Sequence, residues 1–429
     1  MAKPFQPAKV IKVYIFDLFV GAVALDPKFG YYSFAFDPKF IKLSIDLAPL
    51  QMPIKTTSTP MIFTNLPEAT YKRLPAMLAD ALPDDFGNAI VDRYMADQGI
   101  SKDKITALDR LAYMGKRSMG ALEFKPQHGP KKSTSTAIKL GELIHQARNV
   151  IDGSFHSENE TSTTLRNIIE VGTSAGGARA KAVIAINPAT DEIRSGQTTV
   201  PENFEHWLLK FDGIGKDSEL GASSDYGRIE YAYSMMAKKA GIHMTECRLL
   251  EEGGRSHFMI KRFDRIHNTK IHMQTLCAMS HMDYKARGVH SYNQLFSTIE
   301  SLHLPREDLV EAFRRMVFNA MAKNCDDHPK NFSFLLPKGG IWRLSPAYDV
   351  TFAHNPDGEW TYQHLMSING KFTNFTDDDF YDVADRFGVG EIKLILKDVK
   401  TAIAQWESFA KTAGVSLSQV DFIRSFLMP

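Results

Sequence analysis

The periodicity of the apolar residues changes near residue 268, and this change limits the folds that the chain can adopt. Between residues 165 and 267 the pattern predicts short, mostly antiparallel strands with one amphipathic helix over 227–242. After residue 268 most of the pattern is helical, with a clear apolar face over 305–324 and two or three more helices over 377–429. A sheet followed by a helical region predicts an α+β protein.

The first part of the chain has a pattern of its own. Residues 12–50 alternate like strands between turn signals, whereas residues 66–115 are predicted to be helical. Pro83 and the pair Asp84–Asp85 mark the start of one of these helices. We expect three parts along the chain: an N-terminal subdomain at 1–125, a sheet-containing lobe at 126–267 and a mostly helical lobe at 268–429.

The charges of the 429 residues nearly balance, because 51 Lys and Arg face 50 Asp and Glu, a formal net charge of +1. This balance excludes a strongly basic nucleic-acid coat and an acidic disordered tail, although a local basic patch stays open. The three cysteines, Cys247, Cys277 and Cys325, lie far apart, so we expect no disulfide framework and a cytoplasmic location. The sequence contains neither a secretory leader pattern nor an apolar run of membrane-spanning length, and we expect no membrane contact.

The richest group of polar residues is the stretch 324–331, Asn-Cys-Asp-Asp-His-Pro-Lys-Asn, between an apolar helix and a tight hairpin. Asp326 and Asn331 have the spacing of the protein-kinase catalytic loop, in which an Asp accepts the hydroxyl proton and an Asn binds metal. Asp349 follows the hairpin, where kinases place an Asp that binds Mg²⁺. Two other interpretations stay open: ordinary turn and capping roles, and a metal-dependent hydrolase that uses Asp326, His328 and Asp349.

Three further groups of residues precede this loop. A glycine-rich stretch at 171–181 lies between predicted strands, where backbone N–H groups can approach a phosphate, although a simple hairpin turn explains it equally well. Lys210 ends an apolar strand and Glu230 begins the next helix, so the two are expected either to pair and hold ATP phosphates or to be two solvated charges. Residues 261–265, Lys-Arg-Phe-Asp-Arg, are expected to offer backbone groups to adenine, and the equal alternative is a salt-bridge cluster of Arg262, Asp264 and Arg265 between lobes.

In this order of motifs the chain resembles the HipA family of bacterial serine/threonine kinases, the toxin components of HipBA-type toxin–antitoxin modules. The matching pieces are LPDDFG (82–87), GKRSMGALEF (115–124), GTSAGGARAK (172–181), LLKF (208–211), KRFDR (261–265), DDHPKNFSFL (326–335) and LSPAYDV (344–350). They cover nearly the whole chain. The resemblance implies a two-lobed, protein-kinase-like fold with a β-rich N-terminal lobe, an extra small subdomain and an all-helical C-terminal lobe.

The resemblance also implies roles for single residues. Asp326 is the expected catalytic base, Asn331 and Asp349 are expected to hold Mg²⁺, and Lys210 is expected to contact the phosphates of ATP. The expected contacts of the nucleotide are Ser174, Ala175, Gly176, Gly177, Lys181, Lys210, Lys261, Phe263, Asp264, His328 and Lys330. The sequence departs from the family or from eukaryotic kinases at two places: Asn324-Cys325 replaces the His-Arg of the eukaryotic loop, and Gln274-Thr275 stands where relatives often carry an acidic pair.

Ser174 matches the serine that family members autophosphorylate, which ejects the Gly-rich loop and switches the kinase off. The charge of a phosphoserine opposes an incoming triphosphate, which makes this regulation physically reasonable. A turn hydroxyl without a regulatory role is the alternative, since Thr173 is adjacent.

The function implied by the resemblance is Mg·ATP-dependent phosphorylation of a protein Ser or Thr, with glutamyl-tRNA synthetase as the substrate of the best-studied relatives. A second hypothesis is a binding role, as partner of a HipB-like helix-turn-helix antitoxin and co-repressor that reaches operator DNA only through it. Lys116-Arg117 and Lys131-Lys132 are candidate phosphate contacts in that complex, although a solvated surface suits both. A third hypothesis is a small-molecule phosphotransferase of the aminoglycoside kinase type, whose usual His two residues before the Asp is Asn324 here.

Overall fold

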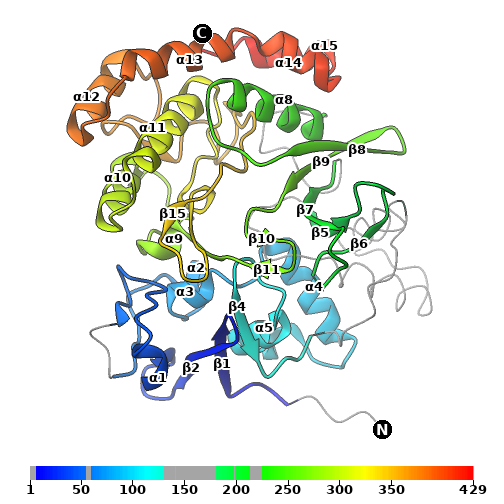
Figure 1. Ribbon diagram of the computed structural model, residues 1–429, viewed down its shortest axis with the longest axis vertical. Coiled ribbons are helices and arrows are strands. Elements are labelled where there is room, and N and C mark those ends of the chain that lie inside the picture. The colour runs from blue at the N-terminus through cyan, green and yellow to red at the C-terminus, as the bar shows by residue number, and fades with distance from the viewer. Residues whose placement is uncertain are drawn as a thin grey trace.

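The computed structural model describes residues 6–54, 59–129, 141, 180–197, 199–212 and 225–428. Figure 1 shows an N-terminal sheet with short helices at the bottom, a second sheet beside and above it, and helices at the C-terminal end. Two large hydrophobic clusters form the core. No helix within the described ranges is long and apolar enough to cross a membrane.

The N-terminal subdomain is built on a four-stranded antiparallel sheet in the order β3-β2-β1-β4. Its strands are β1 (Val10–Ile15), β2 (Leu18–Asp26), β3 (Tyr31–Phe36) and β4 (Leu122–Lys125). Its helices are α1 (Pro38–Ile41), α2 (Glu68–Tyr71), α3 (Ala76–Ala79), α4 (Asp85–Ala96) and α5 (Ala107–Met114). The prediction of strand over 12–50 is wrong after residue 36, because Asp37 accepts hydrogen bonds from the next backbone N–H groups and starts α1.

The second sheet has five strands in the order β6-β5-β7-β9-β8. They are β5 (Lys181–Ile186), β6 (Ile193–Ser195), β7 (Glu205–Lys210), β8 (Cys247–Glu252) and β9 (Arg255–Lys261), all antiparallel. Lys181 and Lys210 are opposite one another in the register of β5 and β7, so their side chains share one face. Helix α8 (Tyr226–Lys239) packs on β9, and Gly241 follows it with a φ of +83°, as the predicted glycine cap requires.

The C-terminal lobe is mainly helical. Its helices are α9 (Leu276–Met279), α10 (Tyr292–Ser301), α11 (Arg306–Met321), α12 (Asp377–Phe387), α13 (Ile392–Ile403), α14 (Trp406–Ala413) and α15 (Leu417–Arg424). Residues 377–429 thus form four helices, α12 to α15, and not the two or three that the sequence predicted. The chain is divided more often because Gly388 and Gly414 adopt left-handed conformations that end α12 and α14.

The expectation of an entirely helical C-terminal lobe needs one correction. Short strands accompany the helices: β10 (Arg265–Ile266), β11 (Thr269–Lys270), β12 (His272–Thr275), β13 (His290–Ser291), β14 (Ser333–Leu336), β15 (Arg343–Leu344) and β16 (Met366–Ser367). The predicted hairpin forms β14 and β15, and β12 joins them in a three-stranded sheet. These segments of two to four residues are too short for stable helices, so they satisfy their backbone groups by pairing.

The N-terminal subdomain is bonded directly to the C-terminal lobe. The carboxylate of Asp80 accepts hydrogen bonds from the backbone N–H (2.7 Å) and hydroxyl (2.8 Å) of Thr275, at the start of α9. The Tyr71 hydroxyl donates to the carbonyl of Cys277 (3.0 Å). All three cysteines are buried and free, as expected. The subdomain is therefore held in a defined position against the helices.

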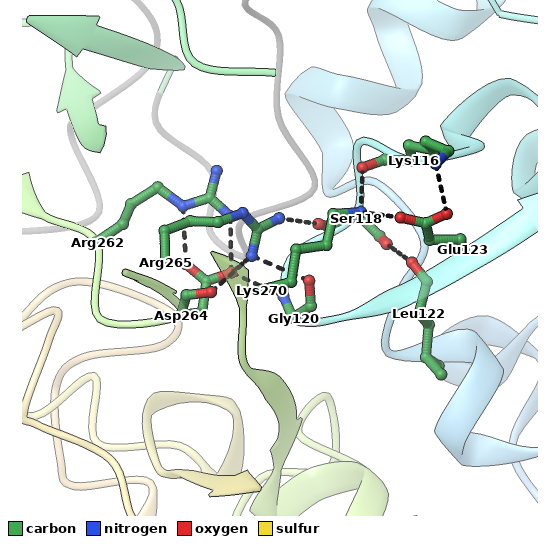
Figure 2. A network of polar contacts seen from close by, with 9 residues as sticks. All are labelled: Lys116, Ser118, Gly120, Leu122, Glu123, Arg262, Asp264, Arg265 and Lys270. Atoms are coloured by element: carbon green, nitrogen blue, oxygen red, sulfur yellow. Dashed lines mark hydrogen bonds and ion pairs between the residues drawn. The ribbon is translucent and has the colours of Figure 1, made fainter. Parts of the chain in front are cut away.

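A buried network of charges also joins the subdomain to the segment that follows β9 (Figure 2). Asp264 accepts from Arg262 Nε (2.8 Å), Arg265 (2.7 Å) and the backbone N–H of Gly120 (2.8 Å), and Arg265 donates to the carbonyl of Ser118 (3.1 Å). Burial alone raises the pKa of Asp264, but the two guanidinium groups lower it far below its usual range. The predicted salt-bridge cluster of Arg262, Asp264 and Arg265 is thus present, and it bonds to Gly120 and Ser118 of the N-terminal subdomain.

We expect Asp264→Ala to reduce the free energy of unfolding by about 3–5 kcal/mol, because it leaves two buried guanidinium groups without their carboxylate. Urea unfolding followed by circular dichroism measures the loss. Asp357→Ala, in an exposed loop, is the matched control and is expected to change stability by less than about 0.5 kcal/mol. Equal effects of the two substitutions would contradict the role of this network.

We expect buried His272 to make the protein sensitive to acid. Burial lowers the pKa of His272 to about 4, below the unfolded value of about 6.5, so the native state excludes a proton that the unfolded state binds. This contribution to stability is present above about pH 6.5 and is lost as the pH falls towards 4. In urea unfolding between pH 7 and 5, His272→Gln should flatten the pH dependence by up to about one proton, whereas His243→Gln, at an exposed position, should not. Parallel curves for wild type and His272→Gln would refute this.

Candidate active site

The loop that carries the predicted catalytic residues lies between α11 and β14. The backbone N–H of Cys325 donates to the carbonyl of Ala353 (2.9 Å), which pairs this loop with the segment after the hairpin. The side chain of Asn324 donates to Asn319 on α11 (3.0 Å), and Asn331 donates to the backbone carbonyl of Asp326 (2.7 Å). The loop is therefore fixed at both ends, and the bond from Asn331 leaves its amide oxygen available.

The carboxylate of Asp326 is 39% exposed. Its closest cationic partner among the described residues is His328, whose Nε2 lies 3.8 Å from Asp326 Oδ1. Burial raises the pKa of Asp326, whereas the nearby His328 lowers it. A carboxylate with a raised pKa and an open face can accept a proton from a bound hydroxyl.

Lys210 lies beside this loop and holds together three segments of the chain. Its Nζ contacts Glu230 Oε1 on α8 at 2.5 Å and also forms an ion pair with Asp349. Burial alone lowers the pKa of Lys210, but the carboxylates of Asp349 and Glu230 raise it overall. Burial raises the pKa of Asp349, but Lys210 and Lys181 lower it to about 2. The predicted pairing of Lys210 with Glu230 is confirmed.

The N-terminal subdomain supplies a residue to the site that the sequence had marked only as a helix start. Asp84 caps α4 by accepting from the N–H of Gly87 (2.7 Å), and its other oxygen lies 3.6 Å from Lys181 Nζ. Both side chains are only 3% exposed. Burial raises the pKa of Asp84 to about 6, against the effect of Lys181. The Asp-Asp pair at 84–85 was visible in the sequence, but its distance from the strand lysine was not.

A partly apolar cavity extends from Lys210 towards the segment after β9. It is lined mainly by Leu122, Leu208, Ile260, Phe263, Met273 and Tyr348, with Lys181, Lys210, Lys330, Asn331 and Asp349 at its polar end. Apolar walls that end in lysines suit a flat base attached to phosphates. The sequence did not single out Met273, because a lone Met has no spacing signal, and Tyr348 entered only as part of the LSPAYDV match.

Lys261, Phe263 and Asp264, which were expected to contact the nucleotide, differ in how far their polar groups are already hydrogen-bonded. The N–H of Lys261 donates to the carbonyl of Glu246 (2.9 Å), and its carbonyl accepts from Thr245 (2.7 Å), so the backbone of Lys261 is already engaged. The oxygens of Asp264 serve the buried network, although the residue lines the cavity. Phe263 has no backbone hydrogen bond within the described part of the chain. It is thus the better placed of these residues to meet a base.

The donor atoms at the polar end suit Mg²⁺, which prefers oxygen ligands and retains waters and phosphate oxygens around a few protein groups. Asn331 and Asp349 would hold such an ion, through an amide and a carboxylate oxygen. Asp326, His328 and Asp349 do not form a three-ligand cluster in the described residues, which gives the hydrolase interpretation no support. Ser174, Ala175, Gly176 and Gly177 lie outside the described residues, so their nucleotide contacts stay predictions.

His328 and Lys330 lie against the ring of Tyr284. The centroids of the His328 and Tyr284 rings are 5.4 Å apart, and Lys330 Nζ lies 4.8 Å from the Tyr284 centroid. Burial lowers the pKa of Lys330, but Tyr284 and Asp80 raise it overall. Lys330 therefore stays charged at the phosphate end of the cavity.

Asp327, next to the predicted base, has a structural role that the sequence did not reveal. Its buried carboxylate accepts from the Tyr292 hydroxyl (2.7 Å) and the Leu365 N–H (2.8 Å), and it lies 2.9 Å from His364 Nδ1. Burial alone lowers the pKa of His364, but Cys325 and Asp327 raise it to about 10. These bonds anchor the loop from below while the carboxylate of Asp326 stays open.

The structure has a protein-kinase-like fold. Its two lobes meet at the ion pairs of Lys210 with Glu230 and Asp349, next to the loop that carries Asp326. Residues 173–406 match the HipA-like C-terminal domain and residues 11–125 match the HipA N-terminal domain. This chain belongs to the HipA family.

The fold also matches a solved HipA. In the structure of the Shewanella oneidensis MR-1 HipA, HipB and operator DNA complex, one chain superposes with a TM-score of 0.68 at 16% identity, covering 97% of this chain and 94% of that one. Two curated proteins named as kinases are similar in sequence: Y4dM of Sinorhizobium fredii, 25% identical over 215 residues, and a protein of Haemophilus influenzae, 24% identical over 210 residues. These alignments cover 45% and 42% of this chain and 51% and 60% of the relatives.

We expect the neighbouring substitutions Asp326→Ala and Asp327→Ala to affect stability in different ways. Asp327→Ala removes the acceptor of a buried charge, a hydroxyl and a backbone N–H, so the free energy of unfolding should fall by about 3–5 kcal/mol. Asp326→Ala removes a carboxylate without a close protein bond and should change it by less than about 1 kcal/mol. Urea unfolding of both variants measures this difference. A larger loss for Asp326→Ala would contradict the assignment of roles.

Proposed function

We propose that this chain is an ATP-dependent kinase that phosphorylates a serine or threonine hydroxyl of another protein. The observation that carries the proposal is the position of Asp326, whose open carboxylate lines one cavity together with Lys210 and Asp349. A carboxylate there can take the hydroxyl proton while the lysines hold phosphates. Membership of the HipA family supports the same activity.

The residues around Asp326 would act mainly by position and charge. Lys181 and Lys210 lie on one face of the sheet and offset the negative charge of a triphosphate. Bound Mg²⁺ would supply further neutralisation of the phosphate oxygens. Asn331 holds the backbone of Asp326 (2.7 Å), so the base keeps its orientation as the hydroxyl approaches.

The proposed regulation and partner come from the family. Ser174 is the proposed autophosphorylation site that switches the kinase off. A HipB-like helix-turn-helix antitoxin is the proposed partner, and operator DNA is reached only through it; the similar Shewanella HipA was solved together with HipB and operator DNA. We propose a component of translation, such as glutamyl-tRNA synthetase, as the substrate, and the cytoplasm as the location.

A binding role without catalysis is the second candidate, favoured by the fold match to a HipA solved in a DNA complex. The suggested phosphate contact at 116–117 is wrong for Arg117, which is buried and stacks on Tyr113 with its Cζ 4.3 Å from the ring centroid. Lys116 pairs with Glu123 at 3.0 Å. Lys131 and Lys132 lie outside the described residues.

We expect purified protein incubated with Mg·ATP to gain phosphate on itself or on a protein of an added lysate, as read by intact mass spectrometry with site mapping. Asp326→Ala should reduce this transfer by about 10²–10⁴-fold, because the base is lost. Asp378→Ala, at an exposed position on α12, is the control and should keep the activity. In cells, the growth inhibition by the wild type should disappear in Asp326→Ala.

Three outcomes would contradict parts of this proposal. Absence of phosphate on every protein, under conditions in which ATP binds, would exclude the kinase. Growth inhibition that persists in Asp326→Ala would favour the binding role. Phosphate on a residue of this chain other than Ser174 would refute the regulatory site and leave the kinase intact.

A further inference from the structure

A second cavity, of about 480 Å³, opens from Asp326 between the N-terminal subdomain and the C-terminal lobe. It shares Lys181, Lys210, Lys330 and Asp349 with the apolar cavity, so the two cavities meet at the phosphate end. Beyond Asp326 its walls come from α2, α4 and α5 on one side and from the segment after α9 on the other. This space therefore offers a hydroxyl of another polypeptide a route to Asp326.

Two lysines, Lys72 and Lys285, line this second cavity without an ion pair to any carboxylate of the described residues. Neither Lys72 nor Lys285 forms an ion pair within 4.0 Å in the described part of the chain, and Lys285 Nζ donates only to the carbonyl of Ala69 (3.3 Å). Burial lowers the pKa of Lys72, and the charge of Lys285 lowers it further, against the smaller opposing effect of Asp85. Two like charges therefore line one concave site.

The third cation of this wall is already neutralised. Arg110 donates to Asp92 (2.6 Å) and to the side chain of Asn88 (2.9 Å), both on α4. Arg110 is thus a structural arginine, whereas Lys72 and Lys285 in the same cavity form no ion pair with the described residues.

The backbone at Lys72 is held in an unusual conformation. Lys72 and Arg73 have φ values of +54° and +65°, in the left-handed region that residues other than glycine rarely adopt. Such conformations cost free energy and are retained where the surrounding structure imposes them, often at binding sites. Here the turn ends α2 and directs the chain so that Lys72 lines the cavity.

The distance between the two lysine-bearing segments is fixed by hydrogen bonds. The hydroxyl of Thr70, two residues before Lys72, donates to Asp283, two residues before Lys285. Tyr71 bonds to the carbonyl of Cys277 in α9. The pair of lysines is thus a preformed feature, built from two parts of the chain that meet only in the folded protein.

We propose that Lys72 and Lys285 form a subsite for an anionic side chain of the polypeptide that is phosphorylated. An acidic group near the acceptor hydroxyl would relieve the repulsion between the lysines and orient the hydroxyl towards Asp326. The anion is a carboxylate of Asp or Glu or a phosphorylated residue. This inference rests on the proposed function, since it assigns the substrate class of the same site.

The test uses the full chain with Mg·ATP and an oriented peptide library that has one central serine and varied flanking positions, including Glu, phosphoserine, Gln and Lys. We expect Glu or phosphoserine at one or more flanking positions to be enriched about two- to fivefold over Gln, the range of a partly exposed ion pair. The double variant Lys72→Glu/Lys285→Glu should reverse the preference to Lys. Lys393→Glu, at an exposed position of α13, is the matched control and should keep the acidic preference.

The outcomes distinguish the inference from the proposed function. Three results would overturn the subsite and leave the kinase activity intact. They are a preference for Lys in the wild type, an acidic preference that survives the double variant, and phosphate transfer without any flanking preference. ATP turnover without phosphorylation of any library peptide also overturns it. If the double variant loses its thermal unfolding transition, Lys72→Gln and Lys285→Gln replace it, and each should reduce the enrichment. Enrichment by phosphoserine but not Glu identifies a phosphorylated substrate.

Discussion

The ion triad at Lys210 is the interaction on which the arrangement of the lobes depends. A buried ammonium group is stable only with charged or polar partners, and here the partners are Glu230 and Asp349, which come from a helix and from the segment after the hairpin. Lys210 itself lies on the sheet. Both carboxylates reach Lys210 only when the sheet, the helix and the C-terminal lobe are packed together. The same ion pairs therefore fix the packing of the lobes and the geometry of the polar end of the cavity.

Adjacent acidic residues in the loop show how stability and chemistry are separated. Asp327 is fully engaged by donors from α10 and from the segment around 364–366, and it anchors the loop. Asp326 is left with an open carboxylate and a raised pKa, which is unfavourable for folding but suits a proton acceptor. Two neighbouring residues of the loop therefore differ in role: Asp327 fixes the loop, and Asp326 keeps an open carboxylate.

The N-terminal subdomain is part of the site as well as of the fold. Asp84 reaches Lys181, and α2 and α4 form one wall of the cavity that opens from Asp326. The bonds from Asp80 and Tyr71 to the start of α9 hold this wall against the C-terminal lobe. A subdomain fixed in this way can shape what reaches the loop, which a mobile appendage could not do.

Much of the local structure followed from the sequence by itself, because periodicity, caps and turn residues act over a few residues. The helix at α11, the capped start of α4, the hairpin and the kinase-like spacing of Asp326, Asn331 and Asp349 were all readable in this way. The pairing of Lys210 with Glu230 was predicted from the order of motifs, but tertiary structure decided most of the other charge contacts. Asp84 and Lys181 are far apart in sequence, as are Lys72 and Lys285, and Asp264 proved to belong to a buried network because Gly120 and two arginines surround it. Distances between such groups depend on how the subdomain and lobes pack, and no spacing along the chain records them.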